Sequence, residues 1–101
     1  AFLSWYDGGI GMEPSDFYQF LPSGLCYDSE GNILVANFSD GIIHVLAPSG
    51  DFKGYIQTEN LEGFRRVSSV CINEAKIIAV GDMEDNTIRF YSIARFKNIF
   101  Q

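Results

Sequence analysis

The sequence predicts an all-β protein built from repeated four-stranded antiparallel meanders, and three observations support this class. Short apolar runs alternate with turn residues at nearly even spacing from residue 22 to residue 57, which is the pattern of strands joined by tight turns. Residues 67–91 align with residues 22–46 without a gap, at an offset of 45 residues. No stretch keeps the i, i+3, i+4, i+7 spacing of an amphipathic helix for more than two turns.

Each strand of the first unit is bounded by turn residues. The four expected strands are Leu25–Tyr27, Asn32–Asn37, Ile42–Ala47 and Phe52–Gln57. The segments between them are rich in Asp, Ser, Gly and Pro, whose side chains and backbone preferences favour turns. Asp40-Gly41 between two apolar runs is a strong short-range hairpin signal. Four short strands joined in this way form an antiparallel meander.

The repeat is carried by identities and by the shared order of apolar and turn positions. The identical pairs are Ser23 and Ser68, Cys26 and Cys71, Ile33 and Ile78, Val35 and Val80, and Ile43 and Ile88. A period in the forties is typical of β-propeller blades. We therefore expect residues 1–101 to be part of a single propeller domain. Its parts would be an outer strand of a preceding blade at 1–5, a complete blade at 22–57 and a second, nearly complete blade at 67–101.

Two runs are apolar at every position rather than at every second one. They are Ile33-Leu34-Val35-Ala36 and Ile77-Ile78-Ala79-Val80. A strand with this pattern belongs to a sheet that is covered on both faces. A lone sheet would leave one face in water, whereas stacked propeller blades cover each other. The pattern therefore favours a partial propeller, and the chain reads as a piece of a larger ring.

Composition and charge limit the possible partners. The chain has 101 residues, 47% of them hydrophobic and 15% aromatic, which is enough for a core. Its net charge is −6, and residues 1–50 contain six acids and no Lys or Arg. Nucleic acid is a poor partner for such a surface, because phosphate binding needs a basic face. No apolar run approaches the roughly 20 residues of a membrane span. The first residues do not resemble a secretion signal, so we expect a cytoplasmic protein.

The two cysteines and the single histidine are each expected to be structural. Cys26 and Cys71 lie within apolar runs and occupy matched positions that point in the same sense, so we expect both to be reduced and buried. His44 aligns with Arg89, which indicates a position on the surface of a strand. A zinc site of the usual Cys/His type is excluded within this chain, and no cofactor is predicted.

Residues 2–52 resemble the NHL repeat of six-bladed β-propellers. The parts that match are Gly9, Gly11, Phe17, Pro22, Gly24, Asp28, Gly31, Asn32, Val35-Ala36-Asn37 and Gly50. The chain departs from the family pattern at Asn37, where Asp is usual, and at Ile42 and Thr87, where Arg is common. The resemblance implies a scaffold that binds a protein or a small ligand.

An enzymatic alternative comes from a second resemblance. The same stretch is similar to blades of the gluconolactonase and regucalcin family, in which the Asp of Pro-Asp-Gly is a ligand of the catalytic divalent metal. Ser23 stands at that position here, and a hydroxyl is a far poorer ligand for a hard cation than a carboxylate. A metal-dependent lactonase or a lyase on a six-bladed propeller therefore stays open as an alternative. Binding is favoured, and no catalytic or metal-ligating residue is assigned.

The expected binding site lies on one rim of the propeller. In a four-stranded meander, the turn between the second and third strands and the loop between units emerge on the same side. Loop tips on a rigid scaffold are where binding residues concentrate. The residues expected to contact a partner on this rim are Tyr18, Phe38, Asp40, Arg65, Arg66, Met83 and Glu84.

Overall fold

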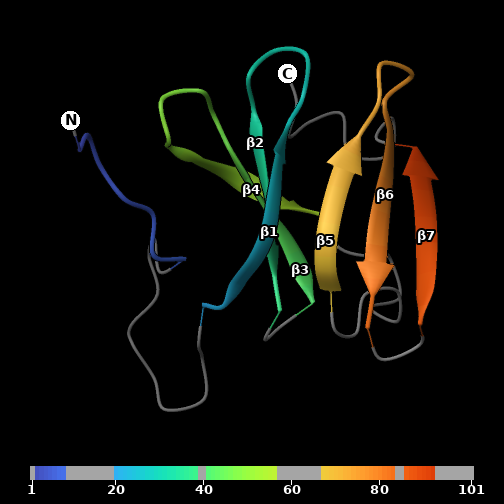
Figure 1. Cartoon of the computed structure of the whole chain (residues 1–101). Helices are drawn as coiled ribbons and strands as arrows, with labels where there is room; N and C mark the ends of the chain where they lie inside the picture. Colours follow the sequence, from blue (N-terminus) through green and yellow to red (C-terminus); the bar gives the residue numbers. More distant parts are fainter. Residues whose placement is uncertain (1, 9–19, 39–40, 57–66, 84–85, 93–101) are drawn as a thin grey trace.

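The computed structural model describes residues 2–8, 20–38, 41–56, 67–83 and 86–92, and these residues form strands and no helix (Figure 1). The strands are β1 (Pro22–Tyr27), β2 (Ile33–Asn37), β3 (Ile42–Leu46), β4 (Phe52–Ile56), β5 (Val67–Ile72), β6 (Ile77–Asp82) and β7 (Thr87–Ser92). The predicted all-β class is therefore confirmed. Within the same ranges, no helix has the length and apolar character needed to span a membrane.

The strands form two antiparallel sheets in which every neighbour in space is also the neighbour in sequence. The first sheet has the order β1-β2-β3-β4 and the second has the order β5-β6-β7. β1 begins at residue 22 and β5 at residue 67, while β3 begins at residue 42 and β7 at residue 87. The 45-residue offset seen in the sequence thus relates the two sheets strand by strand.

A backbone irregularity recurs at the same place in both sheets. The pairing of β1 with β2 shifts register between Pro22 and Gly24, and the pairing of β5 with β6 shifts between Val67 and Ser69. Such a bulge adds one residue to a strand and re-aims its side chain. The added residue is a serine in both sheets. In the first sheet, this serine, Ser23, makes a hydrogen bond to the second sheet.

The turns repeat their backbone geometry even where the residue changes. Gly31 has φ 86°, and Lys76, 45 residues later, has φ 64°. Gly41 has φ 71°, and its equivalent Asn86 has φ 58°. Positive φ is unfavourable for side chains with a Cβ, and Asn tolerates it best. The fold therefore imposes the same turn on both units and places Lys76 in a strained conformation.

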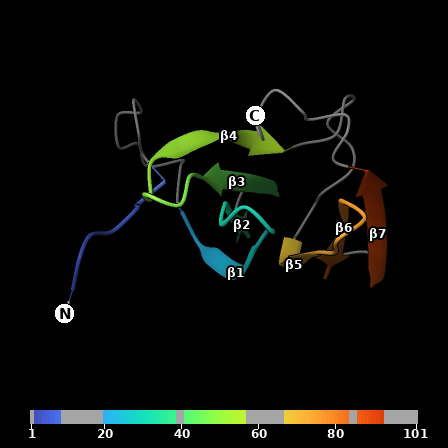
Figure 2. The same cartoon turned by 90° about the horizontal axis from the view of Figure 1, so that it is seen from above.

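The hydrophobic core lies between the two sheets, which stand side by side with β5 next to β1 and β2 (Figure 2). The first sheet contributes Leu34, Ala36, Ile43, Val45 and Ile56, and the second contributes Val67, Val70, Ile78 and Val80. Each large aliphatic side chain removed from water in this way contributes about 2 kcal/mol. Apolar burial between the sheets is therefore the main force that holds them together.

The two all-apolar runs are covered to different extents. In β2, the consecutive residues Leu34, Val35 and Ala36 are all buried, so both faces of this strand are covered as predicted. In β6, Ile78 is buried but the alternate position Ala79 is only half-buried. The described residues therefore cover one face of the second sheet and leave its other face open.

The two cysteines are free thiols, as predicted, but they differ in exposure. Cys26 is half-buried against the core, whereas Cys71 is exposed, so the expected burial of Cys71 is wrong for the described structure. Cys71 lies on the face of β5 that points away from the core. Burial, together with smaller contributions from the nearby Cys71 and Asp28, raises the pKa of the Cys26 thiol to about 11.

One predicted strand lies in the segment before the first sheet. Residues 2–7 form no strand in the structure, although the sequence predicts residues 1–5 to be the outer strand of a preceding blade. A strand exists only with a hydrogen-bonded neighbour. The neighbouring strands of the predicted strand at 1–5 would belong to a preceding blade outside residues 1–101. The assignment therefore stays a prediction.

Candidate functional site

The expected binding rim corresponds to one edge of the two sheets. β1 starts where β2 ends, since Pro22 pairs with Asn37, and β5 starts where β6 ends in the same way. The ends of β2 and β6 therefore lie at the same edge as the starts of β1 and β5, at the bottom of Figure 1. We call this edge the turn rim.

Two of the predicted binding residues can be placed on the turn rim. Phe38 and Met83 are 45 residues apart and each follows the strand end directly, so they occupy equivalent positions. Phe38 is half-buried, whereas Met83 is 58% exposed. The other predicted residues lie outside the described part of the chain: Tyr18, Asp40, Arg65, Arg66 and Glu84.

Two hydrogen bonds at the turn rim join the end of β2 to Leu21, the residue that precedes β1. The buried side chain of Asn37 accepts a hydrogen bond from the Leu21 N–H through Oδ1 at 2.8 Å. The N–H of Phe38 donates to the Leu21 carbonyl at 2.9 Å. Asn37 thus bonds the residue that precedes β1. The rim thus rests on a rigid, hydrogen-bonded base.

His44 is fully buried, which corrects its predicted position on a strand surface. A hydrogen bond of 2.8 Å joins its Nδ1 to the hydroxyl of Tyr6, 38 residues earlier in the chain. The rings of Phe20 and Tyr55 also pack on it, with centroid distances of 5.1 and 5.0 Å. Residues from distant parts of the sequence cover the face of β3 on which His44 lies. The alternation of apolar and polar residues along β3 cannot predict which segments cover it.

Gly8 allows the segment before β1 to lie against this aromatic cluster. It is buried and has φ 78°. A Cβ at this position would lie 2.5 Å from the ring of Phe20, which is closer than atoms can approach. The aromatic cluster of Tyr6, Phe20, His44 and Tyr55 is therefore a packing site for Tyr6 and Gly8, whereas Phe2, Leu3 and Trp5 are exposed.

The opposite edge of the sheets contains a hydrogen-bonded turn at Asp28. Its Oδ1 accepts from the N–H groups of Glu30 and Asn32 at 2.9 and 2.8 Å, and its Oδ2 accepts from the Asn32 side chain at 2.8 Å. Burial alone would raise the pKa of Asp28. The hydrogen bonds from Asn32 and Glu30, with the positive charge of Lys76, outweigh burial and hold the pKa below its usual value. Asp28 and Asn32 therefore have a structural role in this turn.

Ser23 has a structural role in joining strands of the two sheets. Its hydroxyl is within hydrogen-bond distance of two backbone carbonyls, those of Val67 at 2.9 Å and Ala36 at 3.2 Å. Across the described ranges, no group of three or more His, Cys, Asp or Glu side chains is placed to hold a metal ion.

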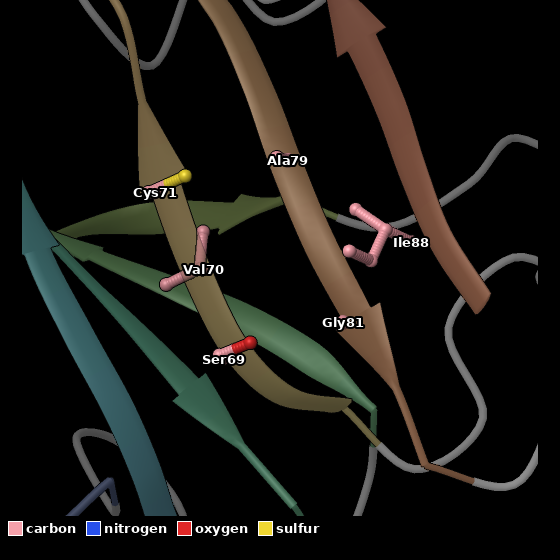
Figure 3. A pocket seen from close by; sticks show the side chains of 6 residues that line it. All are labelled: Ser69, Val70, Cys71, Ala79, Gly81 and Ile88. Carbon is pink, nitrogen blue, oxygen red and sulfur yellow. The ribbon is translucent and has the colours of Figure 1, made fainter. Parts of the chain in front are cut away.

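The open face of the second sheet has a shallow apolar hollow of about 180 Å³. It is lined by Ser69, Val70, Cys71, Ala79, Gly81 and Ile88. In Figure 3, Ile88 extends from β7 beside β6, where Ala79 and Gly81 leave room. Ile88 is 66% exposed and Phe90, on the same strand, is 68% exposed.

Comparison with models of known protein families gave no match to this chain, and no curated protein matches it either.

Proposed function

We propose that this chain is part of an NHL-type, six-bladed β-propeller that acts as a binding scaffold for a protein or a small ligand. The partner would contact the turn rim, through Met83, Phe38 and the flanking residues predicted from the sequence. A cytoplasmic location belongs to the same proposal.

One observation carries this proposal: the two units have the same orientation, so that their equivalent turns reach one edge. Repetition of a rigid meander presents several loop tips to a single partner without requiring the scaffold to change. The exposed Met83 supports the assignment, because methionine adapts to irregular partner surfaces. The acidic balance of the chain favours a protein or a cationic ligand over nucleic acid.

A metal-dependent lactonase or a lyase is the competing function, and no feature of the described residues favours it. The hydroxyl of Ser23 lies within hydrogen-bond distance of the backbone carbonyls of two strands. Lactone hydrolysis by the full-length protein that requires a divalent metal, and that is lost on chelation, would contradict the proposal of binding alone.

Site-specific photo-crosslinking tests the turn rim directly. A photoreactive amino acid is introduced at Met83 in the full-length protein and, as a matched control, at Ala75, which is exposed in the turn at the opposite edge. We expect a specific partner to be crosslinked from position 83 and not from position 75. Crosslinking of the same partner from position 75 alone would overturn the proposal.

A further inference from the structure

The two ends of one long connection meet on the buried side chain of His44. Residues 9–19 lie outside the described structure, but Tyr6 before them and Phe20 after them are both described. A hydrogen bond of 2.8 Å joins the Tyr6 hydroxyl to His44 Nδ1, and the centroid of the Phe20 ring lies 5.1 Å from that of His44. The rings of Tyr6 and Phe20 also contact each other edge to face, at a centroid distance of 5.3 Å. His44 therefore holds both ends of this segment.

The contact between the two ends is tight, and it does not extend to the first residues of the chain. Gly8 is buried, and a Cβ at this position would lie 2.5 Å from the Phe20 ring. In contrast, Leu3 is 91% exposed and Trp5 is 77% exposed. The attachment is therefore local. We call its four residues the His44 anchor: Tyr6, Gly8, Phe20 and His44.

The connection that leads to the second sheet lacks this anchor at the equivalent positions. Ile56 stands in place of Tyr6 at an offset of 50 residues, and Arg89 stands in place of His44 at an offset of 45. Ile and Arg can form neither the hydrogen bond nor the ring contacts that join Tyr6 to His44. The His44 anchor is thus a feature of one connection and not a requirement of the repeat.

The connection that has the anchor is also the longer one. It comprises residues 7–21 before β1, whereas residues 57–66 connect β4 to β5. Holding the ends of a flexible segment together costs more conformational entropy when the segment is longer. The His44 anchor is therefore present where the larger entropic cost has to be offset.

The anchored segment is one from which a partner is expected to be contacted. Residues 9–19 contain Tyr18, one of the residues predicted to bind at the turn rim. Binding removes the conformational freedom of the segments that contact the partner, and this ordering lowers the affinity. Fixing both ends removes part of that freedom before the partner binds. His44 is fully buried, so it can raise the affinity in this way without contacting the partner.

We propose that His44 is a positioning residue for binding at the turn rim. Through Tyr6 and Phe20 it fixes the ends of residues 9–19, and it thereby restricts the positions that Tyr18 can take towards a partner. The proposal rests on the proposed function, and it adds buried residues outside the rim on which the affinity depends.

Hydrogen–deuterium exchange of the native full-length protein tests the anchor without a partner. Tyr6→Phe removes the hydroxyl that bonds to His44 and keeps the ring. We expect the amides of residues 9–19 to exchange about fivefold faster in this variant, as the loss of one hydrogen bond implies, with β2 and β3 unchanged. Tyr55→Phe is the matched control, because Tyr55 also packs on His44, at 5.0 Å, but belongs to β4. Equal exchange of residues 9–19 in Tyr6→Phe and wild type would overturn the proposal, as would faster exchange throughout the first sheet.

Gly8→Ala is a second variant that acts on Phe20 instead of the hydrogen bond. Its Cβ would meet the Phe20 ring at 2.5 Å and displace that ring from His44, so it should also accelerate exchange of residues 9–19. Leu3→Ala is its control, because Leu3 lies outside the anchor and is 91% exposed. Exchange at the wild-type rate in Gly8→Ala would count against the proposal.

Photo-crosslinking in the same variants tests the effect on binding. With a photoreactive amino acid at Tyr18 or at Met83, we expect Tyr6→Phe to lower the crosslinking yield from position 18 relative to position 83. The same ratio of yields in Tyr6→Phe and wild type would refute the positioning role. Absence of crosslinking from both positions in the wild type would instead contradict the proposed function, so the two failures are distinguishable.

Discussion

The hydroxyl of Ser23 lies 2.9 Å from the carbonyl oxygen of Val67, 44 residues later in the chain, and this hydrogen bond joins the first strands of the two sheets. The bulge in β1 places Ser23 between its own sheet and the next one. Gly24, the following residue, allows the close approach of the strands that the bond requires. The sheets are thus linked by a local backbone device as well as by the apolar core.

Gly24→Val should destabilise the packing between the sheets. A Cβ at this position would lie 3.2 Å from the Ser68 carbonyl oxygen and from the Ser69 Cα, and neither backbone atom can move alone. We expect the free energy of unfolding, measured by urea denaturation of the full-length protein, to fall by about 2 kcal/mol. Leu25→Val is the control, since Leu25 is 59% exposed in the described structure. Equal midpoints for the two variants would show that β1 and β5 are not tightly apposed.

Lys76→Gly should stabilise the protein. Lys76 has φ 64°, a conformation that costs a side chain about 1 kcal/mol and costs glycine almost nothing. The substitution also removes the solvent-exposed hydrogen bond of 3.3 Å from Lys76 Nζ to the Ser29 hydroxyl. It removes the charge of Lys76 near Asp28 as well, which is the smallest of the effects that lower the Asp28 pKa. Gly31→Ala is the reciprocal variant at the equivalent position and should destabilise, because Gly31 has φ 86°. A lower Tm for Lys76→Gly would contradict this account of the turn.

Asp28 should make stability depend on acid pH. Its pKa in the folded state is lowered, so the carboxylate stabilises the fold fully above its unfolded pKa of about 3.9. This contribution is lost as the pH falls below about 4, through the folded pKa. Urea midpoints should therefore differ between wild type and Asp28→Asn at neutral pH, and converge in acid. Ser29→Ala, in the same turn, should show the wild-type pH dependence. If the difference in urea midpoint between wild type and Asp28→Asn is the same at every pH, the ionised Asp28 carboxylate does not stabilise the fold.

The turn rim can be tested by a triple substitution at the predicted binding residues outside the described ranges. Tyr18→Ala with Arg65→Ala and Arg66→Ala should weaken partner capture by the full-length protein, with its Tm nearly unchanged. Aromatic and Arg side chains carry much of the energy at protein interfaces. Substitutions at Glu30 and Asp51, on the opposite edge, are the control. If capture survives the triple substitution but is abolished by the control substitutions, the partner binds the edge opposite the turn rim, and the prediction is wrong.

Residues 1–101 expressed alone should aggregate. The described structure exposes large apolar side chains on both outer sides of the pair of sheets: Leu25, Tyr27, Ile88 and Phe90 are between 59% and 68% exposed. Contiguous apolar surface of this kind drives association. The measurement is size-exclusion chromatography followed by thermal denaturation. A soluble monomer with a cooperative melt would be the contrary result.

The strands were predictable because their signals are local. Asp40-Gly41 marks the β2–β3 turn, and the gapless 45-residue alignment anticipated that β5 would repeat β1. The position of His44 was not predictable in this way. Its burial depends on Tyr6 and Phe20, which reach it only after the chain has folded back.

The sequence by itself determined the antiparallel meanders, their repeat and their turns, since these follow from side-chain alternation and from backbone preferences of neighbouring residues. Only the tertiary structure decided which face of each sheet is covered. Cys26 and Cys71 stand at matched positions in matched strands, yet one packs against a neighbouring sheet and the other is exposed. A pattern with a period of two residues distinguishes the two faces of a strand, but what lies over a face depends on chain segments that are distant in the sequence.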